Sequence, residues 1–201
     1  MTAIILIRHG ETDWNRDRRI QGSTDIPLND TGRRQAKDAA AALRDRLDLT
    51  VTPTIVSSDL SRARETAAII ADDLQLAAAR VYPGLRERSY GEAEGIDADE
   101  FFRRWGDWHA AAVPGAEPRP QLLARGIAAL KEAVRAHRRE TAPSSASLIV
   151  VTHGAMIREI LGHASGGELP APGEKLANGS AHELLFERDR LRMVSYESAL
   201  A

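Results

Sequence analysis

The sequence predicts a three-layer α/β/α fold built on a mainly parallel sheet. Short runs of β-branched and leucine residues alternate along the chain with longer segments that carry apolar residues at helical spacing. This alternation is typical of parallel sheets covered by helices on both faces. Two of the apolar runs end in the same dipeptide, His-Gly, and the last segment reads as an antiparallel hairpin at the sheet edge.

The first predicted strand and helix are well marked. The run AIILI at 3–7 contains no polar residue, as expected for a strand buried on both faces. Residues 31–47 are rich in helix formers, and Asn29, Asp30 and Thr31 are available to cap the helix.

The next elements follow the same pattern. Pro53 precedes a short strand, TIVSS at 54–58, and a helix is predicted at 60–74. We expect Ser58 or Asp59 to cap that helix. The segment RVYP, closed by a Pro-Gly pair, is a third strand candidate.

The second half of the chain continues the alternation. Residues 97–113 are predicted to be helical but irregular, and 121–140 carry apolar residues at helical spacing. SLIVVTH at 147–153 is the clearest buried strand and leads into a helix at 154–163. The segment 180–197 reads as a hairpin. Because no repeat or long linker divides the chain, we predict one domain over residues 1–201.

Composition excludes several classes of protein. The chain has 201 residues, 28% of them charged, and a net charge of -2, which argues against a nucleic-acid or acidic-membrane surface. It has no cysteine, which excludes disulfides, thiolate nucleophiles and cysteine-zinc sites. No apolar stretch approaches the roughly 20 residues needed to span a bilayer, and no signal segment is evident. We therefore expect a cytoplasmic enzyme or binding protein.

The two His-Gly pairs lie where ligands bind in parallel sheets. LIRHG and VTHGA each place a histidine, His9 and His153, at the carboxyl end of a predicted strand. In open parallel sheets, ligands bind beyond these ends, near helix N-termini whose free N–H groups favour anions. We therefore expect the two histidines to face one site within a few ångströms of each other, with each glycine allowing close approach to a ligand.

The motifs around these histidines resemble a known family. RHGETDWN is similar to the signature of the histidine phosphatase superfamily, which includes the cofactor-dependent phosphoglycerate mutases. SSDLSRARETA, LRERSYGEAEG and VTHGAMIR match further family segments in the family order. The resemblance covers residues 4–182 and implies a phosphoglycerate mutase-like fold.

The resemblance also implies residue roles. The segment that follows the first motif is similar to the family's substrate loop, where Asn15, Arg19, Gln21 and Gly22 match. Asn15, Gln21 and Gly22 are therefore expected to bind the phosphate or substrate, as is Gly154 at the start of the helix after the second histidine.

The chemistry of phosphoryl transfer fits these residue types. Catalysis consists mainly of positioning and charge stabilisation, and a neutral imidazole is a good nucleophile toward phosphorus. His9 is the candidate nucleophile. Arg8 and Arg62 would grip the phosphoryl oxygens as charge-assisted donors, while His153 and Asn15 would add further donors.

Glu87 is the candidate acid. An alkoxide leaves poorly unless a carboxyl group protonates it, and the resulting carboxylate can then activate water. A salt bridge with Arg86 or Arg88 is the structural alternative from the pattern alone, and the family resemblance favours acid catalysis.

The segment at about 97–120 corresponds to the cap over the active site in relatives. It contains four candidates for substrate specificity: Phe101, Arg104, Trp105 and Trp108. We expect no metal, because the arginines already supply positive charge and no metal-ligand motif such as HExxH is present. We expect no organic cofactor either, because the chain has no Walker loop and no GxGxxG.

Three functions remain open from the sequence. The favoured one is a phosphatase that hydrolyses a small phosphomonoester through phospho-His9. The second is a phosphoglycerate mutase, and the third is a non-catalytic protein that binds phosphorylated ligands. SYGEAEG and PGAEP resemble the phosphatase versions of these segments, although Ala116 and Pro118 depart from the second. No pattern specifies the substrate or the oligomeric state.

Overall fold

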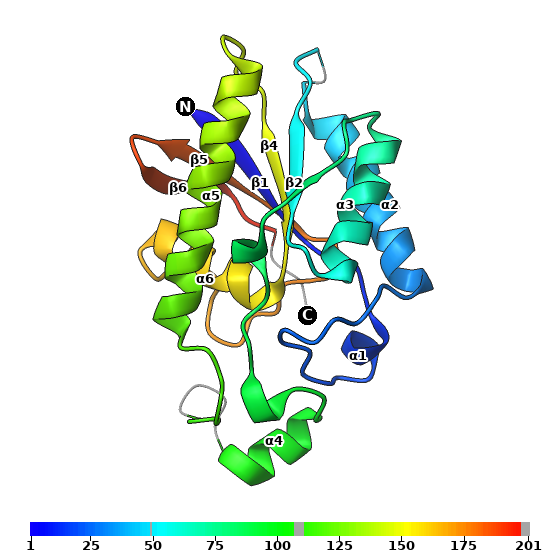
Figure 1. Ribbon diagram of the computed structural model, residues 1–201, viewed down its shortest axis with the longest axis vertical. Coiled ribbons are helices and arrows are strands. Elements are labelled where there is room, and N and C mark those ends of the chain that lie inside the picture. The colour runs from blue at the N-terminus through cyan, green and yellow to red at the C-terminus, as the bar shows by residue number, and fades with distance from the viewer. Residues whose placement is uncertain (49, 107–110, 198–201) are drawn as a thin grey trace.

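A central sheet with helices on both faces organises the molecule (Figure 1). The computed structural model describes residues 1–48, 50–106 and 111–197. Within them, the strand order is β3-β2-β4-β1-β5-β6. The first four of these strands pair in parallel, whereas β5 pairs with β1 and β6 in antiparallel fashion. The predicted fold class is confirmed.

The elements follow the alternation seen in the sequence. In chain order they are β1 (Thr2–Arg8), α1 (Asp13–Arg16), α2 (Asp30–Arg46), β2 (Thr54–Ser57), α3 (Ser61–Asp73), β3 (Arg80–Val81), the 3₁₀ helices η1 (Pro83–Leu85) and η2 (Gly91–Ala93), α4 (Ala98–Trp105), α5 (Arg119–Thr141), β4 (Leu148–Thr152), α6 (Gly154–Ser165), β5 (Ala181–Glu187) and β6 (Arg190–Ser195). None of the described helices is both long enough and apolar enough to cross a membrane.

Alternation of side chains along β1 explains the three layers. Ile4 and Leu6 pack into the core under α5 and α6, while Ile5 and Ile7 pack into the core under α2 and α3. All four are nearly or completely buried. Each contributes about 1.5–3 kcal/mol when fully buried, so a strand without a polar face is stable only between two helical layers.

The structure corrects the predicted helix at 97–113. The helix α4 ends at Trp105, and Gly106 follows it with a φ of 72°, a conformation that L side chains rarely adopt. Residues 107–110 lie outside the described residues, and 111–113 are not helical. The residue pattern that predicted a helix up to 113 thus extends beyond Gly106, the residue at which α4 ends.

Two of the remaining local predictions are confirmed and one is wrong. The side chain of Asn29 caps α2 by accepting from the N–H of Gly32. The hairpin turns at Arg188 and Asp189, which both have positive φ, as two-residue hairpin turns require. However, the N-cap of α3 is Leu60, without a side-chain cap, rather than Ser58 or Asp59.

The carboxyl ends of the parallel strands carry the segments that build a cavity. Figure 1 shows α1 and α4 below these strand ends, away from the layers that cover the sheet. Phe101 of α4 shares a small buried cluster with Ile20 and Ala93, so α4 packs on the loop after α1. This edge of the sheet therefore has walls from the first third of the chain and from α4.

We predict that Gly32→Ala destabilises the fold, because α2 packs closely against the backbone of the loop that follows His9. A methyl group at Gly32 would lie 2.1 Å from the carbonyl oxygen of Glu11, which is backbone and cannot rotate away. Overpacking of this kind costs about 1–3 kcal/mol, measurable by urea unfolding.

Gly162→Ala is the matched control, since its methyl group would lie at an ordinary 3.6 Å from its nearest neighbour, the Leu169 carbonyl oxygen. We expect that change to be neutral or to stabilise α6 by up to about 1 kcal/mol. Equal urea midpoints for the wild type and Gly32→Ala would contradict the close approach of Gly32 to the Glu11 carbonyl.

Candidate active site

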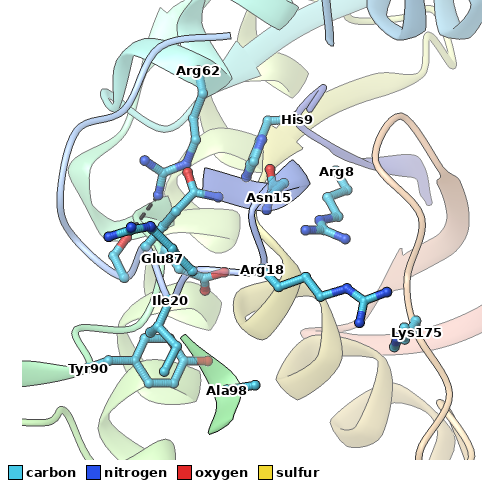
Figure 2. Close-up of a pocket in the computed structure, with 13 residues that line it drawn as sticks. Arg8, His9, Asn15, Arg18, Ile20, Arg62, Glu87, Tyr90, Ala98 and Lys175 are labelled. Atoms are coloured by element: carbon cyan, nitrogen blue, oxygen red, sulfur yellow. Dashed lines mark hydrogen bonds between the residues drawn. The ribbon is translucent and has the colours of Figure 1, made fainter. Parts of the chain in front are cut away.

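A cavity of about 400 Å³ lies at the carboxyl ends of the strands (Figure 2). It is within the size range of small-molecule sites. Its walls come from β1, from the loop after α1, from α3 and from the segments before and within α4. The lining residues are Arg8, His9, Asn15, Arg18, Arg19, Ile20, Gln21, Gly22, Arg62, Glu87, Tyr90, Ala98 and Lys175.

His9 follows β1, and one of its ring nitrogens has no hydrogen-bond partner in the described part of the chain. Its backbone N–H donates to the carbonyl of Thr152, which continues the β1–β4 ladder by one residue. Its Nδ1 lies 2.7 Å from the carbonyl oxygen of Gly10. A carbonyl only accepts, so Nδ1 must carry the proton in the neutral ring. This tautomer leaves the lone pair on Nε2 available for attack.

His153 lies beside His9, as expected from the matching strand ends. The ring centroids are 5.1 Å apart with an angle of 60° between the planes. His153 is completely buried, and neither ring nitrogen has a hydrogen-bond partner among the described residues. Because it is the N-cap residue of α6, its ring lies where the N–H groups of a helix start also favour an anion.

Arg62 is the most deeply buried charge in the site. It lies in the first turn of α3 and has no exposed surface. Its two terminal nitrogens each donate at 2.8 Å, to the carbonyl oxygens of Thr24 and Gly22. Its Nε is buried without a partner among the described residues. Two carbonyls thus fix the orientation of the guanidinium, and the Nε–H group is among the donors that remain unused.

Arg8 forms a second cationic wall. Its Nη1 donates to the carbonyl of Leu176, and its Nε is buried without a partner in the described part of the chain. Burial lowers the pKa of this arginine, and the opposing charge of Glu87 raises it in part. The side chains of Arg8 and Arg62 therefore bring partly desolvated positive charge and two unused N–H groups to one cavity.

These cations and burial keep both histidines neutral. Burial lowers the pKa of His9 well below its usual value, and the charges of Arg62 and Arg8 lower it further. Burial has the largest effect on His153 as well, followed by Arg62 and then His9. A neutral imidazole is the form that can act as a nucleophile.

Asn15 is oriented by its local helix. Its Oδ1 accepts from the backbone N–H and hydroxyl of Thr12 and from the amide of Asn178. Three donors on one oxygen identify that atom as the carbonyl, so the Asn15 amide nitrogen has no acceptor among the described residues and can donate to a ligand. Asn178 also donates to the carbonyl of His9 at 2.9 Å and so ties α1 to the end of β1. The sequence analysis missed Asn178, because no motif or spacing links it to His9 or Asn15.

Glu87 is held by backbone amides. Its carboxylate oxygens accept from the N–H groups of Ala155 at 3.0 Å, Met156 at 3.2 Å and Arg88 at 2.9 Å. The first two belong to the first turn of α6, where free N–H groups attract negative charge. The start of α6 therefore sets the position of this carboxyl group at the cavity wall.

The alternative role for Glu87, a salt bridge, is not what the structure shows. Arg86 instead pairs with Asp59, and Arg88 donates its Nε to the carbonyl of Glu117. Within the described ranges, Glu87 forms no ion pair.

Gln21 and Gly22 form part of the cavity wall, and Glu94 supports them from outside. Gly22 has a φ of 58°, and a methyl group there would lie 2.1 Å from the Glu94 carboxylate. That carboxylate accepts from the backbone N–H and hydroxyl groups of both Ser23 and Thr24, and from the Tyr90 N–H. Burial raises the pKa of Glu94, but these hydrogen bonds outweigh it and the net pKa is lowered. Glu94, which sequence reasoning missed, therefore clamps the loop that Arg62 holds from the other side.

The two His-Gly glycines differ from expectation. A methyl group at Gly10 would lie 2.3 Å from the carbonyl oxygen of Gly32, so Gly10 serves close packing against α2. A methyl group at Gly154 would meet Arg8 and Glu87 at ordinary distances of 3.5 Å and 3.8 Å. Neither glycine lines the cavity, and His153 does not line it either.

The cap candidates lie outside the cavity wall. Phe101 is buried and packs against Trp105, and Arg104 stacks over Trp105 and pairs with Glu100. From this segment it is Ala98 that lines the cavity. Trp108 lies outside the described residues.

In the described part of the chain, no group of three or more metal-ligating side chains comes together.

Comparison with known proteins identifies the family. The model of the histidine phosphatase superfamily (branch 1) matches residues 4–199. The chain belongs to this superfamily. The resemblance stated from the motifs is therefore confirmed over nearly the whole chain.

Relatives in this superfamily carry both phosphatase and mutase names. The chain is 35% identical to the uncharacterized phosphatase PhoE of Bacillus subtilis (strain 168), over 98% of this chain and 94% of the relative. It is 34% identical to the phosphoglycerate mutase-like protein 4 of Arabidopsis thaliana, over 93% of this chain and 81% of the relative. A mycobacterial glucosyl-3-phosphoglycerate phosphatase, solved in complex with VO3, superposes with a TM-score of 0.77 at 29% identity, covering 99% of this chain and 100% of that one.

We predict that His9 and His153 stay neutral through the physiological pH range in the free protein. Because their pKa values are lowered, they bind protons only at a pH well below the usual value of about 6.5. Ring nitrogen shifts in two-dimensional NMR, assigned with His9→Ala and His153→Ala, should therefore show no titration between about pH 8 and 6.5. Midpoints at or above pH 6.5 would show that burial and the arginines do not control these rings.

Proposed function

We propose that this protein is a phosphatase that hydrolyses small phosphomonoesters through a phosphohistidine on His9. The observation that carries the proposal is the set of unused groups around one cavity. His9 has a free Nε2 lone pair, and buried N–H groups of Arg8 and Arg62 lack partners among the described residues. A phosphoryl group offers the acceptor oxygens that such donors require.

In the first step, Nε2 of His9 attacks phosphorus and the bond to the ester oxygen breaks. Arg8, Arg62 and the Asn15 amide would stabilise charge on the three equatorial oxygens. His153, whose ring lies beside that of His9, would add a donor to the same phosphoryl group. Protonated Glu87 would give its proton to the departing alkoxide, so the alcohol leaves neutral.

In the second step, water attacks the phosphohistidine. The Glu87 carboxylate would accept a proton from that water, and the phosphorus–nitrogen bond breaks to release inorganic phosphate and regenerate His9. Gln21 and Gly22 would contact the substrate beside the phosphoryl group, since they line the same wall. All positive charge in this scheme comes from arginine, and we propose that the reaction needs no metal ion or organic cofactor.

A phosphoglycerate mutase is the second candidate, and a mutase-like relative at 34% identity supports keeping it. A mutase would return the phosphoryl group to another hydroxyl instead of to water. Two observations favour hydrolysis. The SYGEAEG segment resembles the phosphatase version, and a relative that matches 98% of this chain is named a phosphatase. With 3-phosphoglycerate, phosphorus NMR should show inorganic phosphate rather than an isomer.

We further propose that the enzyme acts in the cytoplasm, as one domain with a cap at about 97–120, and on small molecules rather than on nucleic acids.

We predict that wild-type enzyme quenched during turnover carries phosphate on His9. The experiment uses a ³²P-labelled phosphomonoester in buffer with excess EDTA, because arginine rather than metal supplies the charge. The label should be acid-labile and base-stable, as expected for a phosphohistidine, and His9→Ala should lack both label and turnover. An acid-stable label, or one that maps to another residue, would remove His9 from its role. Dependence on an added divalent ion would refute the metal-free scheme.

We predict that Glu87→Gln slows alkyl phosphates far more than p-nitrophenyl phosphate in the phosphorylation step. An alkoxide needs the proton that Glu87 would donate, whereas p-nitrophenolate leaves largely unaided. The phosphorylation rate with an alkyl phosphate should fall by about 10²–10⁴-fold, the usual range for general acid–base catalysis. The burst of p-nitrophenolate in stopped flow should change much less, while its later steady state slows.

The burst is the decisive measurement, because steady-state rates also include hydrolysis of the phosphoenzyme. Equal losses of phosphorylation rate for both substrates would leave Glu87 without an acid role. Arg86→Gln is a useful control, since its side chain pairs with Asp59 and does not line the cavity. We expect that variant to retain both rates.

A further inference from the structure

The mouth of the cavity has two chemically different sides. Figure 2 shows Arg18 extending toward Lys175, away from the side on which Tyr90 and Ile20 lie. Both cations line the same cavity as His9. They are exposed, and neither is among the groups held by the carbonyls and amides described above.

Arg18 and Lys175 lack counter-ions in the described part of the chain. The contrast with Arg16, two residues earlier, is informative, because Arg16 pairs with both Asp13 and Asp17. Neither Arg18 nor Lys175 forms an ion pair or a side-chain hydrogen bond with another described residue. Two unpaired cations directed toward each other favour an anion between them.

Hydrogen bonds fix the backbone segments that carry Arg18 and Lys175. Arg18 has a φ of 55°, an uncommon conformation for a residue with a side chain, and its N–H donates to the carbonyl of Asn15. Arg158 donates to the carbonyl of Glu174, directly before Lys175. Arg8 donates to the carbonyl of Leu176, directly after it. The two cations therefore stand on fixed segments, and the second is linked directly to a phosphate-facing arginine.

The charge in the cavity exceeds what one phosphate needs. The lining contains five cationic side chains and a single carboxylate, Glu87. A phosphate dianion would leave net positive charge, and the charges that remain nearest the mouth include Arg18 and Lys175. We infer that, if the proposed phosphatase activity holds, the preferred substrates carry a second anionic group, a carboxylate or a phosphate, which binds between Arg18 and Lys175.

The first test compares substrates that differ in that group alone. 3-Phosphoglycerate and glycerol 3-phosphate are primary alkyl phosphates of similar size, but the first carries a carboxylate where the second has a hydroxymethyl group. We expect kcat/KM to be at least about tenfold higher for 3-phosphoglycerate at low ionic strength, and the ratio to fall as salt is raised. Fructose 1,6-bisphosphate against fructose 6-phosphate tests a second phosphate in the same way. No preference in either pair would overturn the inference.

The second test removes the two cations. Arg18→Gln with Lys175→Gln should abolish most of the preference, with a much larger loss for the member of each pair that carries the second anionic group. Arg16→Gln with Lys37→Gln is the matched control, since it changes net charge equally at exposed positions outside the cavity. Preference should survive in that control. Equal losses for all substrates in the Arg18/Lys175 variant would mean general attraction of anions instead of a subsite.

Binding separates failure of this inference from failure of the proposed function. If the wild type hydrolyses none of these esters, the phosphatase proposal fails, and titration calorimetry with 3-phosphoglycerate and glycerol 3-phosphate still tests the subsite. Tighter binding of 3-phosphoglycerate, lost in the Arg18/Lys175 variant, would support the subsite on its own. If hydrolysis proceeds without preference and binding is equal, the subsite is refuted while the phosphatase stands.

Discussion

The complete burial of Arg62 is the constraint on which the site depends. A guanidinium without exposed surface is costly unless its donors are satisfied, and no carboxylate pairs with it directly among the described residues. Its terminal nitrogens are satisfied by the carbonyls of Gly22 and Thr24, while Glu87, Asp25 and Glu94 compensate its charge from a greater distance. The same charge adds to burial in lowering the pKa values of His9 and His153, so the proposed phosphate-binding arginine also favours the neutral form of both rings.

The loop that holds Arg62 is fixed from two further directions. Glu94 accepts from the amides and hydroxyls of Ser23 and Thr24, whose loop offers its carbonyls to Arg62 on the other side. Asp25 accepts from the backbone and hydroxyl of Ser61, in the first turn of the helix that carries Arg62. The carbonyls of this loop accept from Arg62, while its N–H and hydroxyl groups donate to Glu94. The Arg62 guanidinium is thus held rigidly without a direct ion pair among the described residues. Donors held in this way need no reorganisation when charge develops on a phosphoryl group.

Local patterns predicted the fold and the strand-end residues well, because those depend on short-range features. AIILI had to be a buried strand, and a histidine directly after such a strand had to reach the carboxyl edge of the sheet. Glu94 and Asn178 were missed because their partners lie about 70 and 169 positions away in the chain, where periodicity carries no information. The overlong helix at 97–113 and the misplaced cap of α3 show the opposite limit, since Gly106 and Leu60 decided those boundaries through backbone conformation rather than composition.

The spacing between His9 and Glu87, the proposed nucleophile and acid, follows from one strand pairing. Arg8 of β1 lies opposite Thr152 of β4, so the next residues on the two strands, His9 and His153, are neighbours. His153 is also the N-cap of α6, and the first-turn amides of α6 hold Glu87. A shift of β1 against β4 would separate His9 from both Glu87 and His153, whereas a change in α6 alone would move Glu87 and His153 together. The buried apolar register of β1 and β4 resists such a shift, because moving by one residue would exchange the side chains of the two cores. The relative positions of His9, His153 and Glu87 are therefore set by the buried register of the sheet rather than by the loops at the mouth of the cavity.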